Sequence, residues 1–174
     1  KVESRRLRGE PFGHFEPPES PAERRSREQM APAVLMYEEL RERYGGDRAY
    51  EVAEAVVIES AVEFLGRTVG ELHRDELLNM DVDERRAFVE KRGENFHNAE
   101  LRWDTVEPDR VEFTVTRCHF AELCEELGVP ELAPAFCAGD GEFFGGVEED
   151  VALERQSTIA KGGEVCPFRI ELSE

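Results

Sequence analysis

Residues 111–118 read VEFTVTRC, and this stretch decides the fold class. Apolar and polar side chains alternate along it, a period of two that is typical of a half-buried β-strand. The chain before it places apolar residues three or four positions apart, which indicates amphipathic helices. The alternating residues are Val111, Glu112, Phe113, Thr114, Val115 and Thr116, and Cys118 ends the stretch. The change of period predicts a helical first half followed by a β-rich second half.

The pattern after this strand predicts further β-structure around one helix. The predicted elements are a helix at 119–127, a glycine-rich loop at 138–146 (AGDGEFFGG) and strands at 151–160 and 165–172. The turn at 161–164 (KGGE) predicts that the last two strands pair as a hairpin. Pro167 lacks an N–H donor, so we expect the last strand at an edge of the sheet. One face of that strand would carry Cys166, Phe168, Ile170 and Leu172.

The first half of the chain reads as an arm followed by helices. Residues 1–28 mix charged residues with four prolines, which favours an arm with little fixed structure. Helices are predicted at 29–44, 48–65, 69–79 and 82–92. Residues 29–174 are interpreted as a single domain, with a helical half at 29–104 and a cysteine-bearing half at 105–174. The predicted fold class is α+β, with N-terminal helices packed on a small, mostly antiparallel sheet that has one inserted helix.

Composition narrows the possible partners. The chain has 40 acidic against 22 basic residues and a formal net charge of −18. This charge argues against nucleic acid, whose binding depends on neutralising phosphates, and against anionic membrane surfaces. No apolar run approaches the roughly 20 residues that span a bilayer, and the N-terminal segment lacks the apolar stretch of a signal peptide. We therefore expect a cytoplasmic protein whose partner is a small molecule, while a homodimer stays open because an edge strand needs cover.

The four cysteines all lie in the second half of the chain, at 118, 124, 137 and 166. They form no Cys-x-x-Cys pair, which removes zinc-ribbon and thioredoxin-type signals, and free thiols are expected in the cytoplasm. Cys124 falls on the apolar stripe of its helix and is interpreted as a buried hydrophobic residue. Cys118, Cys137 and Cys166 fall at strand ends or loops, where sites are usually built. They are either structural thiols or parts of one site.

Two chemical roles are open to a convergent set of thiols. A thiolate could act as a nucleophile, and Cys118 immediately precedes a helix, whose positive end favours a thiolate. Alternatively, Cys118, Cys137 and Cys166 could hold a zinc ion together with Asp140 or His119. His119 could equally be a first-turn helix residue in solvent. No cofactor is required by the sequence, and zinc is the one that these residue types allow.

Three further residues are candidates for polar roles. Asp140 lies between two glycines, so it is either a turn residue or a carboxylate held near Cys137 as a general base or polar anchor. Glu154 and Arg155 lie mid-strand, and one of them must face inward if the sheet is covered on one side. Arg155 could hold a substrate carboxylate by a two-pronged contact. The alternative is a cross-strand ion pair on the surface.

The C-terminal segments TRCHFAELCEELGVPELAPAFCAGD and ERQSTIAKGGEVCPFRIEL together resemble the L-2-amino-thiazoline-4-carboxylic acid hydrolase family. The resemblance covers roughly residues 105–172, and the helical half resembles the family only loosely. It is carried by Cys118, Gly128 to Leu132, Cys137, Asp140, Glu154, Arg155, Thr158, Gly162, Cys166 and Phe168. Pro167 stands where the family more often has Asp. The same closing pattern is similar to vinyl-reductase-type domains that bind small molecules.

The resemblance implies a hydrolase that opens a cyclic C–N bond in a small carboxylate substrate. The implied catalytic set is Cys137 as nucleophile or metal-holding thiolate, Asp140 as base, and Cys118 and Cys166 as their neighbours. Arg155 would anchor the substrate carboxylate, and Glu154 and His119 complete the implied substrate-binding set. The alternative is a non-catalytic small-molecule-binding or sensory domain on the same fold, in which the thiols would be inert and protonated.

Overall fold

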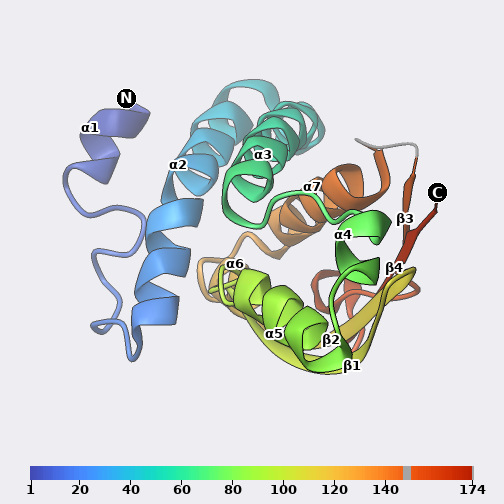
Figure 1. Cartoon of the computed structure of the whole chain (residues 1–174). Helices are drawn as coiled ribbons and strands as arrows, with labels where there is room; N and C mark the ends of the chain where they lie inside the picture. The colour runs from blue at the N-terminus through green and yellow to red at the C-terminus, as the bar shows by residue number, and fades with distance from the viewer. Residues whose placement is uncertain (147–149, 174) are drawn as a thin grey trace.

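The computed structural model of the chain describes residues 1–146 and 150–173. Within them, four antiparallel strands form one sheet in the order β1-β2-β4-β3 (Figure 1). The strands are β1 (Ala99–Glu107), β2 (Arg110–Cys118), β3 (Val151–Glu154) and β4 (Cys166–Leu172). The α-helices are α1 (Val2–Arg6), α2 (Pro21–Tyr44), α3 (Gly46–Thr68), α4 (Arg74–Leu78), α5 (Val82–Gly93), α6 (His119–Glu126) and α7 (Ala133–Gly146). Two short 3-10 helices, η1 (Pro130–Leu132) and η2 (Ile159–Lys161), complete the described elements. The predicted α+β class is confirmed, and the predicted domain end at Glu174 lies outside the described residues.

Helix α2 begins at Pro21, earlier than the predicted start at residue 29. The Oγ atom of Ser20 accepts a hydrogen bond from the backbone N–H of Glu23 at 3.1 Å, and proline is favourable at the first helical position. Upstream, Arg5 on α1 forms an ion pair with Glu38 on α2, with 2.6 Å between Nη2 and Oε2. The segment predicted as an arm therefore contains α1 and the first turns of α2.

The next helices follow their local signals only in part. The predicted helix at 82–92 is confirmed as α5, whose first turn has the reciprocal hydrogen bonds of a capping box between Asp81 and Glu84. Helix α3 runs past its predicted end to Thr68, because the Thr68 hydroxyl donates to the Phe64 carbonyl at 2.7 Å instead of capping a new helix. The predicted helix at 69–79 is reduced to the short α4.

The sequence reasoning did not predict strand β1, although apolar and polar residues alternate along part of it. Its residues alternate between half-buried and exposed positions up to Thr105, and a register shift between Trp103 and Thr105 interrupts the period. Trp103 pairs with Phe113 of β2 and packs on Gly93, where an added Cβ would lie 2.3 Å from the Trp103 ring. The interrupted alternation and the many charged residues conceal this strand from a simple period count.

The second pair of strands corrects two predictions. Strand β3 ends at Glu154, so the predicted strand at 151–160 is only partly formed, and a longer connection with η2 replaces the four-residue turn. The predicted pairing is confirmed, with Val151 opposite Leu172. The prediction of β4 as an edge strand is wrong, because β4 lies between β2 and β3. Pro167 is tolerated there because β3 pairs with β4 only from Arg169 onward, so that at Pro167 the sole strand neighbour is Thr114 of β2.

The predicted glycine-rich loop at 138–146 is wrong, because these residues belong to helix α7. Long-range packing outweighs the poor helix propensity of glycine. An added Cβ at Gly139 would lie 2.3 Å from the Cβ of Ala61, so glycine lets α7 approach α3 closely. Figure 1 shows α7 running beside α3. Two helices, α6 and α7, thus stand between β2 and β3 where one was predicted.

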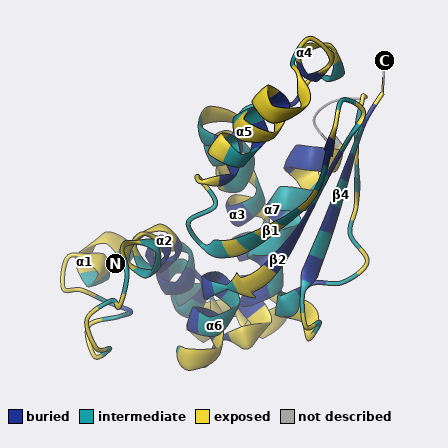
Figure 2. Cartoon of the chain, turned by 60° about the horizontal axis from the view of Figure 1, so that its bottom comes forward, coloured by how far each residue is buried: buried dark blue, intermediate teal, exposed yellow. Residues whose placement is uncertain are grey.

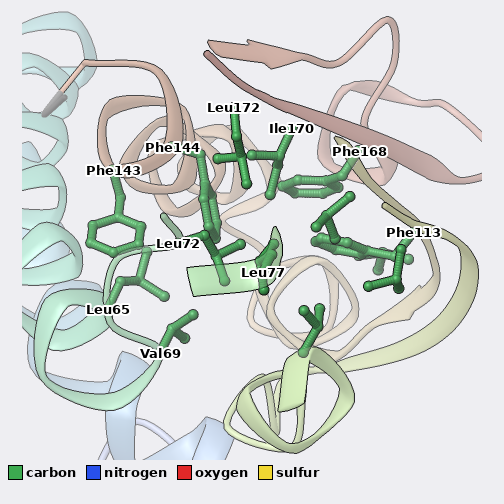
Figure 3. Packing of buried hydrophobic residues seen from close by; sticks show 14 of the residues in the cluster. Leu65, Val69, Leu72, Leu77, Phe113, Phe143, Phe144, Phe168, Ile170 and Leu172 are labelled. Carbon is green, nitrogen blue, oxygen red and sulfur yellow. The ribbon is translucent and has the colours of Figure 1, made fainter. Parts of the chain in front are cut away.

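The apolar interior forms two clusters. One lies between the sheet and helices α3, α4, α5 and α7, where Phe113 and Phe168 stack with ring centroids 4.7 Å apart. Phe143 and Phe144 of α7 extend into this cluster (Figure 3). The other joins α2, α3, α6 and the start of α7 around Met30. Figure 2 shows buried residues along β2 and β4, whereas much of α1, α4 and α5 is exposed. Cys166, Phe168, Ile170 and Leu172 share the buried face of β4, as predicted.

Candidate functional site

The chain brings the candidate residues together from four elements. Cys118 ends β2 and Cys166 begins β4, and these two strands are neighbours whose register pairs Val115 with Cys166. Both sulfurs therefore lie at the same end of the sheet. Cys137 and Asp140 lie three positions apart on α7, and so share one helix face. The segment after β3 contributes Arg155.

Mutual electrostatic effects show that these groups lie within range of one another. The charges of Asp140, Cys118 and Cys166 each act to raise the pKa of the Cys137 thiol. Asp140 acts in the same direction on the pKa values of Cys118 and Cys166. Asp140 thus acts electrostatically on three thiols that are distant along the chain.

The Arg155 guanidinium joins the segment after β3 to helix α7. Its Nη2 donates to the backbone carbonyl oxygen of Cys137 at 2.8 Å, and its Nη1 lies 3.5 Å from Oδ2 of Asp140. Its central carbon lies 5.0 Å from the centre of the Phe168 ring. The Arg155 side chain is 14% exposed, so of the pair Glu154 and Arg155 it is Arg155 that faces inward.

Asp140 has the properties of a proton carrier. Burial raises its pKa from 3.8 to about 6, and the positive charge of Arg155 opposes this rise. Its side chain is 26% exposed, and so keeps some contact with solvent. A carboxyl group that titrates near neutral pH can both accept and return a proton.

The thiols are held in their protonated form. Burial raises the pKa of Cys137 to about 12, with a further contribution from the negative charge of Asp140. Burial also raises the pKa of Cys118, although the backbone N–H groups of Ala121 and Phe120 at the start of α6 oppose it. The pKa of Cys166 is likewise raised by burial, against the Ile159 backbone N–H that donates to its sulfur at 3.1 Å. The expected thiolate at Cys118 is therefore not favoured, because burial outweighs the helix N-terminus.

Three residues discussed in the sequence analysis make their contacts away from Asp140 and Arg155. Cys124 is fully buried in the helical cluster, as predicted. Glu154 is exposed and lies 3.8 Å from Arg169, which is the surface ion pair given above as the alternative. The buried His119 ring lies 3.5 Å from Glu122 on its own helix, and not in solvent.

The zinc alternative lacks a ligand set. Across residues 1–146 and 150–173, no group of three or more His, Cys, Asp or Glu side chains is arranged to hold a metal ion. Cys118, Cys137 and Cys166 lie within electrostatic range of each other but do not form such a group.

The sequence reasoning did not single out two residues beside the cluster. Tyr50 of α3 donates to Glu54 at 2.8 Å; burial raises its pKa to about 12, and the charge of Cys137 adds to that rise. Thr158, quoted above only as part of a pattern, is 7% exposed, and its neighbour Ile159 contacts the Cys166 sulfur. The helical spacing of Tyr50 to Glu54 was a visible signal, whereas nothing local marks Thr158.

Comparison with known proteins places the chain in a family of hydrolases. The family model of L-2-amino-thiazoline-4-carboxylic acid hydrolase matches residues 24–170, which is most of the chain and not only the C-terminal half. The protein belongs to the L-2-amino-thiazoline-4-carboxylic acid hydrolase family. No curated protein and no solved structure matches it. Family membership supports a hydrolase-like function in general. In the described part of the chain, every helix is too short or too polar to cross a membrane.

Proposed function

We propose that the protein hydrolyses a cyclic isothiourea that carries a carboxylate, of the kind named by its family, with Asp140 as base and Cys137 as nucleophile. One observation carries this proposal. The Asp140 carboxyl, whose pKa burial raises to about 6, stands three residues from the half-buried Cys137 thiol and is ion-paired to Arg155. General bases work best when their pKa lies near the working pH.

The first half of the reaction opens the ring. Asp140 takes the proton of the Cys137 thiol while the sulfur bonds to the carbon of the C=N group, and the proton passes to the ring nitrogen. The ring carbon–sulfur bond then breaks, and the substrate sulfur leaves with the electron pair. A base is needed because burial and the charge of Asp140 raise the pKa of Cys137 to about 12, so that the resting thiol is protonated.

The second half releases the product. Water adds to the same carbon, and Asp140 passes one of its protons to the substrate sulfur. The carbonyl group then forms, and the Cys137 sulfur leaves with the second proton. The product is an N-carbamoyl-cysteine, and its atoms balance substrate plus water. The ring bond that breaks is carbon–sulfur, while the C=N bond becomes single, which refines the expectation of a broken C–N bond.

Arg155 supplies a candidate anchor for the substrate carboxylate. A guanidinium has five N–H donors, and in Arg155 one faces the Cys137 carbonyl and another faces Asp140. We assign the other donors of this guanidinium to the substrate carboxylate, beside the base. This arrangement supports a substrate whose carboxylate and reacting carbon lie a few bonds apart.

The experiment is turnover of 2-amino-thiazoline-4-carboxylate with acid quenching and mass spectrometry. We expect the wild type to form N-carbamoyl-cysteine and a transient adduct on Cys137. Cys137→Ser should abolish turnover, whereas Cys124→Ala, in the helical cluster, should retain it. Unchanged turnover by Cys137→Ser would remove this thiol from the mechanism.

A ligand-binding module is the second candidate function, and the raised pKa values of all four thiols favour it. Such a protein would bind the same carboxylate without forming product. Thiol titration against pH separates the two candidates. Substrate that accelerates alkylation of Cys137 below pH 8 supports catalysis, and thiols that stay unreactive with bound substrate support the binder.

A further inference from the structure

The hydroxyl of Thr158 is a buried polar group without a partner among the described residues. Its Oγ1 atom is inaccessible and makes no hydrogen bond. A buried hydroxyl that is left unpaired costs about 1–3 kcal/mol, so a chain retains one only for a reason. By contrast, the hydroxyl of Ser157 next to it donates to the carbonyl oxygen of Val165 at 3.0 Å.

The backbone of Thr158 is fixed, so the unpaired hydroxyl does not reflect a loose loop. Its carbonyl oxygen accepts hydrogen bonds from the N–H groups of Lys161 at 3.0 Å and Gly163 at 2.9 Å. Threonine commonly caps a helix start, yet here the side chain does not cap η2. The hydroxyl is therefore held in place and left unused by the protein.

The position of Thr158 relates it to the thiol cluster. The N–H of Ile159, the next residue, donates to the Cys166 sulfur at 3.1 Å. That nitrogen is two covalent bonds from the Thr158 Cα, and this Cα therefore lies within about 6 Å of the sulfur. Three residues upstream, Arg155 contacts both Cys137 and Asp140. The unpaired hydroxyl thus belongs to the segment that borders the candidate site on the side of β4.

We propose that the Thr158 hydroxyl, whose Oγ1 atom is covered in this structure, becomes a hydrogen-bonding contact for the bound substrate when the side chains that cover it move aside, and that it contributes to substrate recognition. The inference rests on the proposed function, and it adds a specificity residue to the base, nucleophile and anchor. The amino group and ring nitrogen of a cyclic isothiourea both offer partners for a hydroxyl. A site whose buried hydroxyl is satisfied only by substrate discriminates strongly against analogues that leave it unpaired.

The test is Thr158→Val, which removes the hydroxyl and keeps the shape of the side chain. We expect an equal or higher melting temperature, because no protein hydrogen bond is lost, together with a fall in kcat/KM for 2-amino-thiazoline-4-carboxylate of about tenfold or more. Thr158→Ser restores a hydroxyl and should recover most of that loss. The matched control is Thr68→Val, whose hydroxyl donates to Phe64 at 2.7 Å. This variant should melt at a lower temperature and keep its kcat/KM.

The outcomes separate this inference from the proposed function. Wild-type kcat/KM in Thr158→Val, or a clear drop in its melting temperature, would overturn the substrate contact and leave the hydrolase proposal standing. If the wild type binds the probe without turnover, the hydrolase proposal fails, and weaker binding by Thr158→Val in calorimetry would still support the contact. A wild type that does not bind the probe overturns both.

Discussion

The guanidinium of Arg155 and the carboxylate of Asp140 form an ion pair, with 3.5 Å between Nη1 and Oδ2, that joins the segment after β3 to helix α7. The pair is only partly covered, and two opposing effects set the pKa of Asp140. Burial raises the pKa of Asp140, and Arg155 limits that rise. The balance gives the carboxyl a pKa of about 6, so that it is mostly ionised at physiological pH and titrates just below it. The first two predictions follow from this pKa.

The pH dependence of turnover should follow Asp140. Its pKa of about 6 predicts that kcat/KM rises with pH through about 6, because the base must be ionised to accept a proton. Asp140→Asn should lower kcat/KM by about 100-fold or more and remove this limb of the profile. A pH–rate profile of both proteins checks this. An unchanged acid limb in Asp140→Asn would assign the titration to another group.

Stability should depend on Asp140 in the opposite sense. Because the folded-state pKa is raised from 3.8 to about 6, the native protein binds this proton more tightly than the unfolded chain does. The stabilising effect is full below pH 4 and is lost as the pH rises through 6. Asp140→Asn should therefore gain stability relative to the wild type between pH 4 and 7, by no more than about 3 kcal/mol. Urea unfolding of the two proteins at pH 4 and pH 7 measures this. A difference in unfolding free energy between the proteins that is the same at the two pH values would contradict it.

Arg155 should matter most for substrates that carry a carboxylate. Arg155→Met should lower kcat/KM for 2-amino-thiazoline-4-carboxylate, and should lower it about tenfold less for 2-amino-thiazoline, which has no carboxylate. Arg155→Lys keeps the positive charge but loses the two-pronged guanidinium contact. Its kcat/KM for 2-amino-thiazoline-4-carboxylate should therefore lie between those of the wild type and Arg155→Met. Equal losses on both compounds would show that Arg155 only positions Asp140 and Cys137.

The close approach of α7 to α3 should be sensitive to a single methyl group. In Gly139→Ala the new Cβ would lie 2.3 Å from that of Ala61, so the helices must move apart. We expect a loss of about 1–3 kcal/mol in unfolding free energy, together with reduced turnover because α7 carries Cys137 and Asp140. Adding Ala61→Gly should recover part of both losses. Chemical unfolding and kinetics of the single and double variants check this, and no recovery would place the cause of the loss elsewhere.

The sequence predicted elements whose signals are local. The alternation of β2, the stripe of α6 and the capping box at Asp81 and Glu84 needed no distant partner. Helix α7 and the place of Pro167 could not be read in this way. The first depends on contact between Gly139 and Ala61, and the second depends on where β3 stops pairing.

The candidate site followed the same division. Cys118 and Cys166 could be picked out from their positions, because the end of β2 and the start of β4 can be identified in the sequence. Their protonation could not, because it depends on burial beneath elements far away in the chain. The unpaired Thr158 hydroxyl is visible only when every possible partner is placed in space. The catalytic roles of these residues stay predictions.

The strand order also constrains the sequence of events during synthesis. Among the described strands β4 is made last, and it must insert between two strands that are already made. A nascent chain that has been made only as far as Glu164 has no partner for β3 and no Cys166, and Arg155 has no Phe168 ring against it. Strand β4 must therefore emerge before the sheet and the cluster of thiol and polar groups can be completed, and a chain truncated before Cys166 would carry Cys137 without those surroundings.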